Sequence, residues 1–179
     1  KQLKEKIGIE IKQDILENHH KPIYLGIGSN IGNRKNNINR ACYFINDFCT
    51  IKYVSNFYET KSWPKEYYPK YLNIILKCYS NLRPCSLLKR LKKIEKTLGR
   101  KKTARNLPRT CDIDIIDYKG FIHDKINIKI PHPRLSDRNF VLIPLFEIEK
   151  TWKHPKSNIP IHKLLKNLDL NSLRSIKIF

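Results

Sequence analysis

Two segments with helical periodicity separate four strand-like segments in this chain, and this alternation constrains its fold more than any other feature. In residues 34–49 the apolar positions 38, 41, 42, 45, 48 and 49 have the spacing of one helix face. A second apolar stripe, which includes Leu87, Leu91 and Ile94, ends at Gly99, a typical helix stop. The segments 23–28, 51–60, 71–80 and 111–118 are rich in apolar, β-branched and aromatic residues, and we predict them to be strands.

The resulting order, β-α-β-β-α-β, indicates an α+β fold: a ferredoxin-like antiparallel sheet with helices packed on it, in other words an α/β sandwich. After the strand at 111–118, "INIKI" (126–130) is predicted to be its partner strand. A helix is predicted near 135–149 and a short one over "IHKLLKNL" (161–168). We expect residues 1–21 to form an N-terminal extension and residues 22–179 a single domain.

The composition fits one compact domain. The chain has 179 residues, of which 40% are hydrophobic, and none of its apolar runs approaches the ~18 residues of a membrane span. Its five cysteines form no CxxC pair, and we interpret all of them as reduced packing residues rather than zinc ligands. We therefore expect a cytoplasmic protein that does not bind membranes and is a monomer.

The net charge is +20, from 36 Lys and Arg against 16 Asp and Glu. A polyanion is one explanation, and a basic nucleic-acid-binding module on a ferredoxin-like fold is the competing hypothesis for function. The lysines are spread along the whole chain, which favours a compositional bias for most of them. Such a module has no use for a pair of carboxylates on one strand, because these repel phosphates.

The glycines of "GIGSNIG" (26–32) do not match a nucleotide fingerprint. They follow the pattern G-x-G-x-x-x-G instead of G-x-G-x-x-G, and the chain contains no G-x-x-x-x-G-K-[ST]. A turn from strand to helix explains them. Ser29 and Asn30 in this turn could cap the helix or face a ligand.

Asp112 and Asp114 stand two residues apart in "RTCDIDIIDY" (109–118), so in a strand both carboxylates lie on the same face. They could form an exposed face paired with Arg105 and Arg109. Alternatively they bind magnesium, which takes one or two carboxylates together with phosphates and water. Two carboxylates at this spacing can share two Mg²⁺ ions that clamp a nucleoside triphosphate, and the basic loop upstream then meets the remaining phosphate charge.

Four motifs together resemble the 6-hydroxymethyl-7,8-dihydropterin pyrophosphokinase family. They are "YLGIGSNIGNR" (24–34), "FYET" (57–60) with "YLN" (71–73), "LGR" (98–100) with "PRTCDIDI" (108–115), and "IPHPRLSDRNFVLIPLFEI" (130–148). The resemblance covers about residues 22–150 and implies transfer of pyrophosphate from ATP to the hydroxymethyl group of the pterin, with release of AMP, in folate biosynthesis. It makes residues 22–179 a pyrophosphokinase domain whose partners are small molecules and not nucleic acid.

The resemblance also implies roles for individual residues. Asp112 and Asp114 match the two magnesium ligands, and with Arg100 and Arg109 they form the expected catalytic set. The pterin residues are Thr60, Trp63, Tyr71, Asn73 and Phe140, with the rings of Tyr71 and Phe140 on either side of the flat substrate. The nucleotide residues are Glu95, Lys102, Arg109, His132 and Arg138. Glu95 could equally be a lysine-paired surface residue of the helix, and Arg105 corresponds to an arginine of a mobile loop.

Two loops depart from the pattern of the family. Residues 105–109 read "RNLPR" where many members have "RWGPR", and Lys102 stands where arginine is frequent. "TKSWP" (60–64) replaces a more proline-rich segment. These changes affect the expected closure of the two loops over the site and the affinity for ATP rather than the reaction itself.

Overall fold

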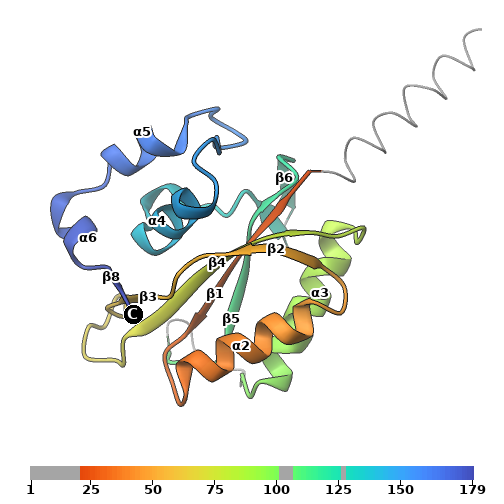
Figure 1. The fold of residues 1–179 in the computed structure, drawn as a ribbon, viewed down its shortest axis with the longest axis horizontal. Coiled ribbons are helices and arrows are strands. Elements are labelled where there is room, and N and C mark those ends of the chain that lie inside the picture. Colours follow the sequence, from red (N-terminus) through yellow and green to blue (C-terminus); the bar gives the residue numbers. More distant parts are fainter. Residues whose placement is uncertain (1–20, 101–106, 126–127) are drawn as a thin grey trace, which may run out of the picture.

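The structure, a computed structural model, describes residues 21–100, 107–125 and 128–179. Its main feature is one antiparallel sheet between two layers of helices (Figure 1). One face of this sheet is covered by α2 (Arg34–Ile45) and α3 (Pro84–Thr97), and the other by α4 (Asn139–Ile148) and α5 (Ile161–Lys166). The predicted N-terminal extension lies, apart from Lys21, outside the described residues.

The first half of the chain forms most of the sheet, largely where the sequence predicts it. The sheet order is β5-β1-β4-β3-β8, where β8 is Lys177–Ile178, and β2 also pairs with β4. The elements up to β5 are β1 (Ile23–Ser29), α2 (Arg34–Ile45), β2 (Thr50–Val54), β3 (Tyr58–Thr60), β4 (Tyr71–Tyr79), α3 (Pro84–Thr97) and β5 (Asp112–Tyr118). Mixed α and β structure with an antiparallel sheet is thus confirmed.

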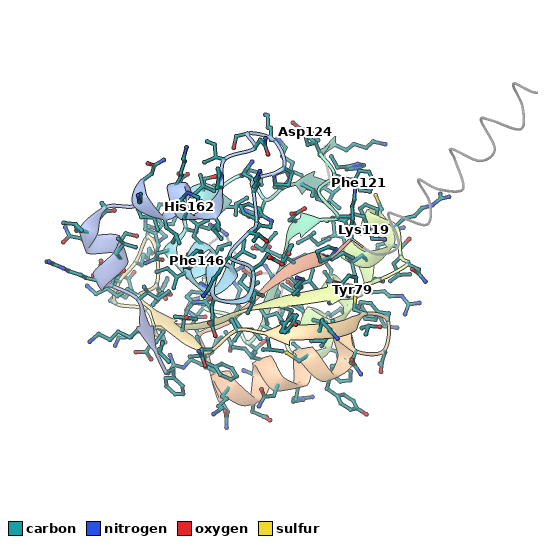
Figure 2. All side chains as sticks on the ribbon, turned by 45° about the horizontal axis from the view of Figure 1, so that its top comes forward. Tyr79, Lys119, Phe121, Asp124, Phe146 and His162 are labelled. Atoms are coloured by element: carbon teal, nitrogen blue, oxygen red, sulfur yellow. The ribbon has the colours of Figure 1, made fainter. Side chains whose placement is uncertain are left out.

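Alternating strand residues supply two separate cores. On β1, Ile23, Leu25 and Ile27 face α2 and α3, where they are fully or almost fully buried. Tyr24 points the other way and packs in the second core, which contains Trp152 and residues of α4 and α5. Figure 2 shows Phe146 of α4 and His162 of α5 on this second side of the sheet.

The predicted strand at 51–60 is in fact two short strands. Its register against β4 shifts between Ile51 and Tyr53, and the chain leaves the ladder at Ser55 and Asn56. The hydroxyl of Ser55 accepts the N–H of Ile75 at 2.9 Å. The backbone N–H of Asn56 donates to the carboxylate of Glu147 on α4 at 3.1 Å. The N–H of Ser55 still donates to Ile75 C=O on β4 at 3.0 Å, so a contact from the helix layer replaces strand pairing only at Asn56.

Two further predictions after β5 need correction. The segment 128–130 (β7) does not pair with β5; it pairs with β6 (His123–Lys125) in a separate two-stranded sheet. The predicted helix at 135–149 is divided into a 3₁₀ turn, η1 (Leu135–Asp137), and α4 (Asn139–Ile148). Arg138 between them has extended backbone angles, φ −111° and ψ 106°, which end the turn.

The last 29 residues are packed onto the rest of the fold. They contain α5 (Ile161–Lys166), α6 (Leu170–Arg174) and β8 (Lys177–Ile178), of which the sequence predicted only α5. β8 pairs with β3, and Phe179 N–H donates to Phe57 C=O at 2.9 Å. Among the described residues, no helix has the length and apolar character needed to cross a membrane.

Candidate active site

Three neighbouring strands present the candidate site on the α4 side of the sheet. β1 lies between β4 and β5, and Gly28 on β1 is paired with Asn73 on one side and with Asp112 on the other. A Cβ atom at Gly28 would lie 2.8 Å from Oδ1 of Asn73. Glycine therefore leaves a strip of bare backbone between the amide and the carboxylate, which a ligand can approach closely.

Asp112 lies between two arginines. Arg100 Nη1 is 2.5 Å from Asp112 Oδ1, and Arg109 Nη1 is 3.2 Å from Asp112 Oδ2. Burial acts to raise the pKa of Asp112, but Arg109 and Arg100 outweigh it and hold the pKa below its ordinary value. The carboxylate is therefore kept ionised, as a metal ligand must be.

Asp114 has an imidazole and a guanidinium as looser neighbours on the same face. His132 Nε2 and Arg138 Nη1 lie 3.8 and 3.7 Å from Asp114 Oδ2. Burial lowers the pKa of His132, and the charges of Arg138 and Arg134 add to this effect against the pull of Asp114. The extended backbone at Arg138, which interrupts the predicted helix, is the feature that lets its guanidinium reach toward Asp114.

Glu95 is buried behind Asp112, with a side chain only 3% exposed. Its Oε1 lies 2.6 Å from Arg100 Nη1 and 2.7 Å from Lys92 Nζ, and it accepts the N–H of Ile113 at 2.7 Å. The interpretation of Glu95 as a surface residue is therefore wrong, although its pairing with a lysine is confirmed. Glu95 fixes both the β5 backbone and the arginine that contacts Asp112.

On the β4 side, three of the predicted pterin residues lie together. Asn73 Nδ2 donates to Thr60 Oγ1 at 3.1 Å, and both residues are buried. Tyr71 is on the same strand face as Asn73, and the pKa of its hydroxyl is raised by burial, with Arg109 and Asp112 close enough to act on it in opposite directions. The aromatic ring is thus adjacent to the arginine and carboxylate cluster.

The other two predicted pterin residues, Trp63 and Phe140, lie in the loop between β3 and β4 and at the start of α4. Trp63 is 71% exposed, and its ring lies 5.8 Å from the guanidinium of Arg134. Phe140 is half-buried at the start of α4, with the guanidinium of Arg138 5.3 Å from its ring centre. Lys102 and Arg105 lie outside the described residues.

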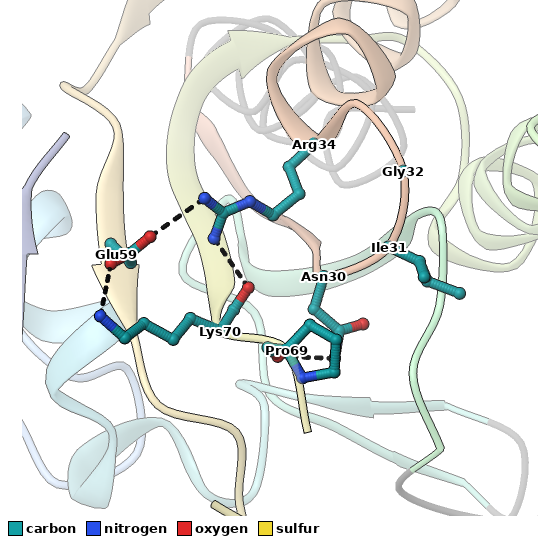
Figure 3. A pocket seen from close by; sticks show the side chains of 7 residues that line it. All are labelled: Asn30, Ile31, Gly32, Arg34, Glu59, Pro69 and Lys70. Atoms are coloured by element: carbon teal, nitrogen blue, oxygen red, sulfur yellow. Dashed lines mark hydrogen bonds and ion pairs between the residues drawn. The ribbon is translucent and has the colours of Figure 1, made fainter. Parts of the chain in front are cut away.

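Two cavities adjoin the strand face. One, of about 250 Å³, is lined by Asp114, Lys129 and His132 together with the apolar side chains of Leu88, Ile115, Ile128 and Pro133. The other, of about 390 Å³, lies at the turn after β1 (Figure 3). In it Glu59 pairs with Arg34 and Lys70, each at 3.0 Å.

Asn30, whose role the sequence left open, joins the two sides of the site. Its backbone N–H donates to Arg109 C=O at 3.1 Å, and its Oδ1 accepts the Arg109 N–H at 2.7 Å. Its Nδ2 donates to Ser62 Oγ and to Pro69 C=O at 3.3 and 3.1 Å. These partners come from distant segments, so spacing within "GIGSNIG" carries no signal for this role.

The donor set suits a hard divalent cation. Among the described residues, no three His, Cys, Asp or Glu side chains gather into a closed metal cage. Two aspartates on one face, partly exposed at 27% and 34%, leave the rest of a coordination shell for phosphate and water oxygens.

The thiol of Cys111 is buried on the opposite face, and burial raises its pKa to about 12, so it behaves as a packing residue.

Of the five cysteines, all are free, and Cys85 differs from the prediction because it is exposed on α3. The other four are buried or half-buried, as expected for packing residues.

Comparison with known proteins supports the resemblance. A family model described as 7,8-dihydro-6-hydroxymethylpterin-pyrophosphokinase matches residues 24–150. A 2-amino-4-hydroxy-6-hydroxymethyldihydropteridine pyrophosphokinase of Aquifex aeolicus is 40% identical over 139 residues, which cover 78% of this chain and 87% of that protein. A folic acid synthesis protein of Dictyostelium discoideum is 37% identical over 146 residues, covering 82% of this chain but only 22% of that longer protein.

Solved structures agree on the fold. A wild-type Plasmodium falciparum HPPK-DHPS with pterin and p-hydroxybenzoate superposes with a TM-score of 0.67 at 15% identity, covering 88% of this chain and 46% of that chain. An HPPK-DHPS in complex with substrates gives a TM-score of 0.63 at 14% identity, covering 82% of this chain and 43% of that one. This chain thus spans less than half of each. The chain belongs to the 7,8-dihydro-6-hydroxymethylpterin-pyrophosphokinase family, a family of ATP-dependent pyrophosphokinases.

Proposed function

We propose that this chain transfers pyrophosphate from ATP to the hydroxymethyl group of 6-hydroxymethyl-7,8-dihydropterin, with release of AMP, in folate biosynthesis. Family membership and the match along most of the Aquifex protein support the reaction. One structural observation carries the proposal: the carboxylates of β5 and the Tyr71–Asn73 pair of β4 lie on one sheet face, separated by a single glycine strand position. With only one strand between them, the two groups can hold two substrates close enough for in-line attack.

Asp112 and Asp114 are the residues that we assign to magnesium, with two ions expected. Mg²⁺ held by these two carboxylates would neutralise part of the charge of the triphosphate. The arginines that now pair with Asp112 are also positioned to bind phosphate oxygens, because a guanidinium binds carboxylate and phosphate with the same forked geometry. When the nucleotide binds, Arg100 and Arg109 contact its phosphate oxygens in place of the Asp112 carboxylate.

The nucleotide extends along β5 toward η1. Arg100, Arg109, His132 and Arg138 line this path, and Lys102 is assigned to it from the sequence alone. The cavity of about 250 Å³ beside Asp114 has apolar walls, which suit a flat purine base. Glu95, also assigned to the nucleotide site, acts there by holding Arg100 and the β5 backbone.

The pterin lies over the start of β4. Tyr71 and Phe140 stack on its two faces, and Asn73 binds its donor and acceptor edge. Thr60 accepts the Asn73 N–H, so the amide is held in one orientation with Oδ1 next to Gly28. Trp63 is exposed in the adjoining loop, from where it can cover the pocket.

The remaining assignments concern the domain, its oligomeric state and its location. We assign residues 22–179 to one pyrophosphokinase domain on a ferredoxin-like sheet, a view supported by the strand order and by helices on both faces. A monomer located in the cytoplasm is the expected state. The nucleic-acid-binding alternative receives no support from the family match, and helices pack on both faces of the sheet.

The test is a product assay with ATP, Mg²⁺ and 6-hydroxymethyl-7,8-dihydropterin. AMP formed in equal amount with a pyrophosphorylated pterin is the expected result, because attack is at the β-phosphorus. ADP would indicate transfer of the γ-phosphoryl group instead, and the absence of both nucleotides as products would contradict the assignment. Omission of the pterin is the control, since hydrolysis of ATP alone could also release AMP.

A further inference from the structure

We propose that the C-terminal segment 170–179 positions Arg138 and Phe140 through Asn139 and thereby sets the affinity of the pterin pocket. The inference rests on the roles proposed above for these two residues. Asn139 is a positioning residue in this scheme, because it contacts neighbouring protein groups and no substrate is assigned to it.

Asn139 connects the two segments directly. It is the first residue of α4 and only 8% exposed. Its Nδ2 donates to the backbone C=O of Ser172 at 2.6 Å and to Ser175 Oγ at 3.1 Å. Its Oδ1 accepts the N–H of Phe140 at 2.6 Å. One amide side chain thus ties α6 to the backbone that carries the aromatic ring.

The helix start needs such a contact because it lacks a conventional cap. Arg138 occupies the N-cap position of α4 without a side-chain hydrogen bond to the helix. A guanidinium has donors but no acceptor, so Arg138 cannot accept a helix N–H, and its Nη1 lies 3.7 Å from Asp114 Oδ2. Asn139 supplies the missing anchor from the next position.

The same segment also contacts the opposite wall of the pocket. β8 extends the sheet at β3, with Ile178 paired to Tyr58 and Lys177 paired to Glu59. The next residue of β3 is Thr60, which holds the Asn73 amide. The segment therefore braces Phe140 on one side of the pterin and Thr60 on the other, although it lies beyond the residues 24–150 that the family model matches.

Two substitutions at Asn139 separate the contact with the tail from the local contact. Asn139→Asp keeps the oxygen that accepts the Phe140 N–H but replaces the donor to Ser172 C=O with a second acceptor. Asn139→Ala removes both. If the tail positions the site, both variants raise the pterin Kd by about tenfold, which corresponds to ~1.4 kcal/mol, and raise KM for the pterin more than they lower kcat.

A variant in α6, with a matched control, tests the contact between the C-terminal segment and α4 without a substitution in α4. Asp169 Oδ1 accepts the Ser172 N–H at 2.8 Å and so caps α6. Asp169→Ala frays α6 and is expected to raise the pterin Kd in the same direction, by a smaller factor. Asn171→Ala, an exposed position on the same short helix, is the matched control and leaves the Kd unchanged.

The outcomes distinguish this inference from the proposed function. Thermal unfolding of each variant confirms that it is folded at the assay temperature. Wild-type affinity for the pterin in Asn139→Asp, in an otherwise active enzyme, would overturn the role of the tail. A wild-type protein that binds the pterin and makes no AMP would contradict the proposed reaction and leave the positioning test in place.

Discussion

At the scale of single residues, the alternation along β5 determines where the chemistry lies. Asp112 and Asp114 share one face because strand side chains alternate, and this was predictable from sequence. The ion pair of Asp112 with Arg109 was predictable too, because Arg109 is a near neighbour in the chain. Asn30 was not, since its four bonds reach residues 62, 69 and 109, whose proximity depends on the folded sheet.

The aromatic ring at the start of α4 gives the first prediction. Phe140→Ala removes one face of the proposed stack and is expected to raise the pterin Kd at least tenfold, or ~1.4 kcal/mol, with little change in the Kd for ATP. Titration of the protein with each ligand measures both constants. Phe146→Ala is the matched control, because it truncates another half-buried phenylalanine of the same helix. Equal losses for both ligands would refute the stacking role.

Gly28 provides a second prediction at this scale. An alanine Cβ would meet Asn73 Oδ1 at 2.8 Å, closer than real contacts allow, so the amide would have to turn away from Thr60. Gly28→Ala is therefore expected to raise KM for the pterin by about tenfold while the variant stays folded. Steady-state kinetics with each substrate varied in turn would show the effect. An unchanged pterin KM would mean that the Asn73 amide does not bind substrate.

At the scale of elements, the types of most segments were predictable and their partners were not. The apolar period identified β1, α2, β4, α3 and β5 within a few residues. The break at Ser55 and Asn56 depends on Glu147, which lies 91 residues away from Asn56. The pairing of β7 with β6 likewise depends on where the chain turns after β5. Interactions between distant segments decided these cases.

The C-terminal end of α4 gives a prediction about pH. Glu149 accepts hydrogen bonds from Tyr24, Thr151 and Lys77. Burial acts to raise the pKa of Glu149, but its hydrogen bonds with Lys77 and Thr151 outweigh this and lower the pKa below its ordinary value. A lowered pKa in the folded state means that the stabilisation is present above the unfolded pKa and is lost as the pH falls through the folded pKa.

Accordingly, Glu149→Gln is expected to lower the free energy of unfolding by no more than about 1 kcal/mol at pH 7, since the pair is partly exposed. Below the folded pKa of Glu149 the difference from wild type should vanish. Urea unfolding across a pH series measures this. Glu66→Gln, which removes a carboxylate from an exposed ion pair with Lys61, provides a comparison. A difference that persists at the acid end would show that the loss is not electrostatic.

At the scale of the whole molecule, the fold class followed from the order of elements alone, whereas the closing strand β8 did not. It has two residues, and its pairing requires the free edge of β3. The large positive charge is also a property of the whole chain: at +20 it creates a field that attracts anions from a distance.

This charge leads to a kinetic prediction. The association rate constant for ATP is expected to fall at least about threefold between low and physiological ionic strength, because salt screens the field. The pterin is uncharged, so its association rate should hardly change and serves as the internal control. Stopped-flow fluorescence measures both rates. Equal salt dependence for the two ligands would show that the positive charge does not steer the nucleotide.

The central claim is that Asp112 and Asp114 bind divalent ions together with the nucleotide. The most direct measurement is a titration of Mn²⁺, followed by electron paramagnetic resonance, in the presence of an ATP analogue that cannot be cleaved between the α- and β-phosphates. The wild-type protein should take up two ions per chain, and the double variant Asp112→Asn, Asp114→Asn should take up fewer, while Asp124→Asn on the exposed hairpin behaves as wild type. Undiminished Mn²⁺ uptake by a folded double variant would contradict the account.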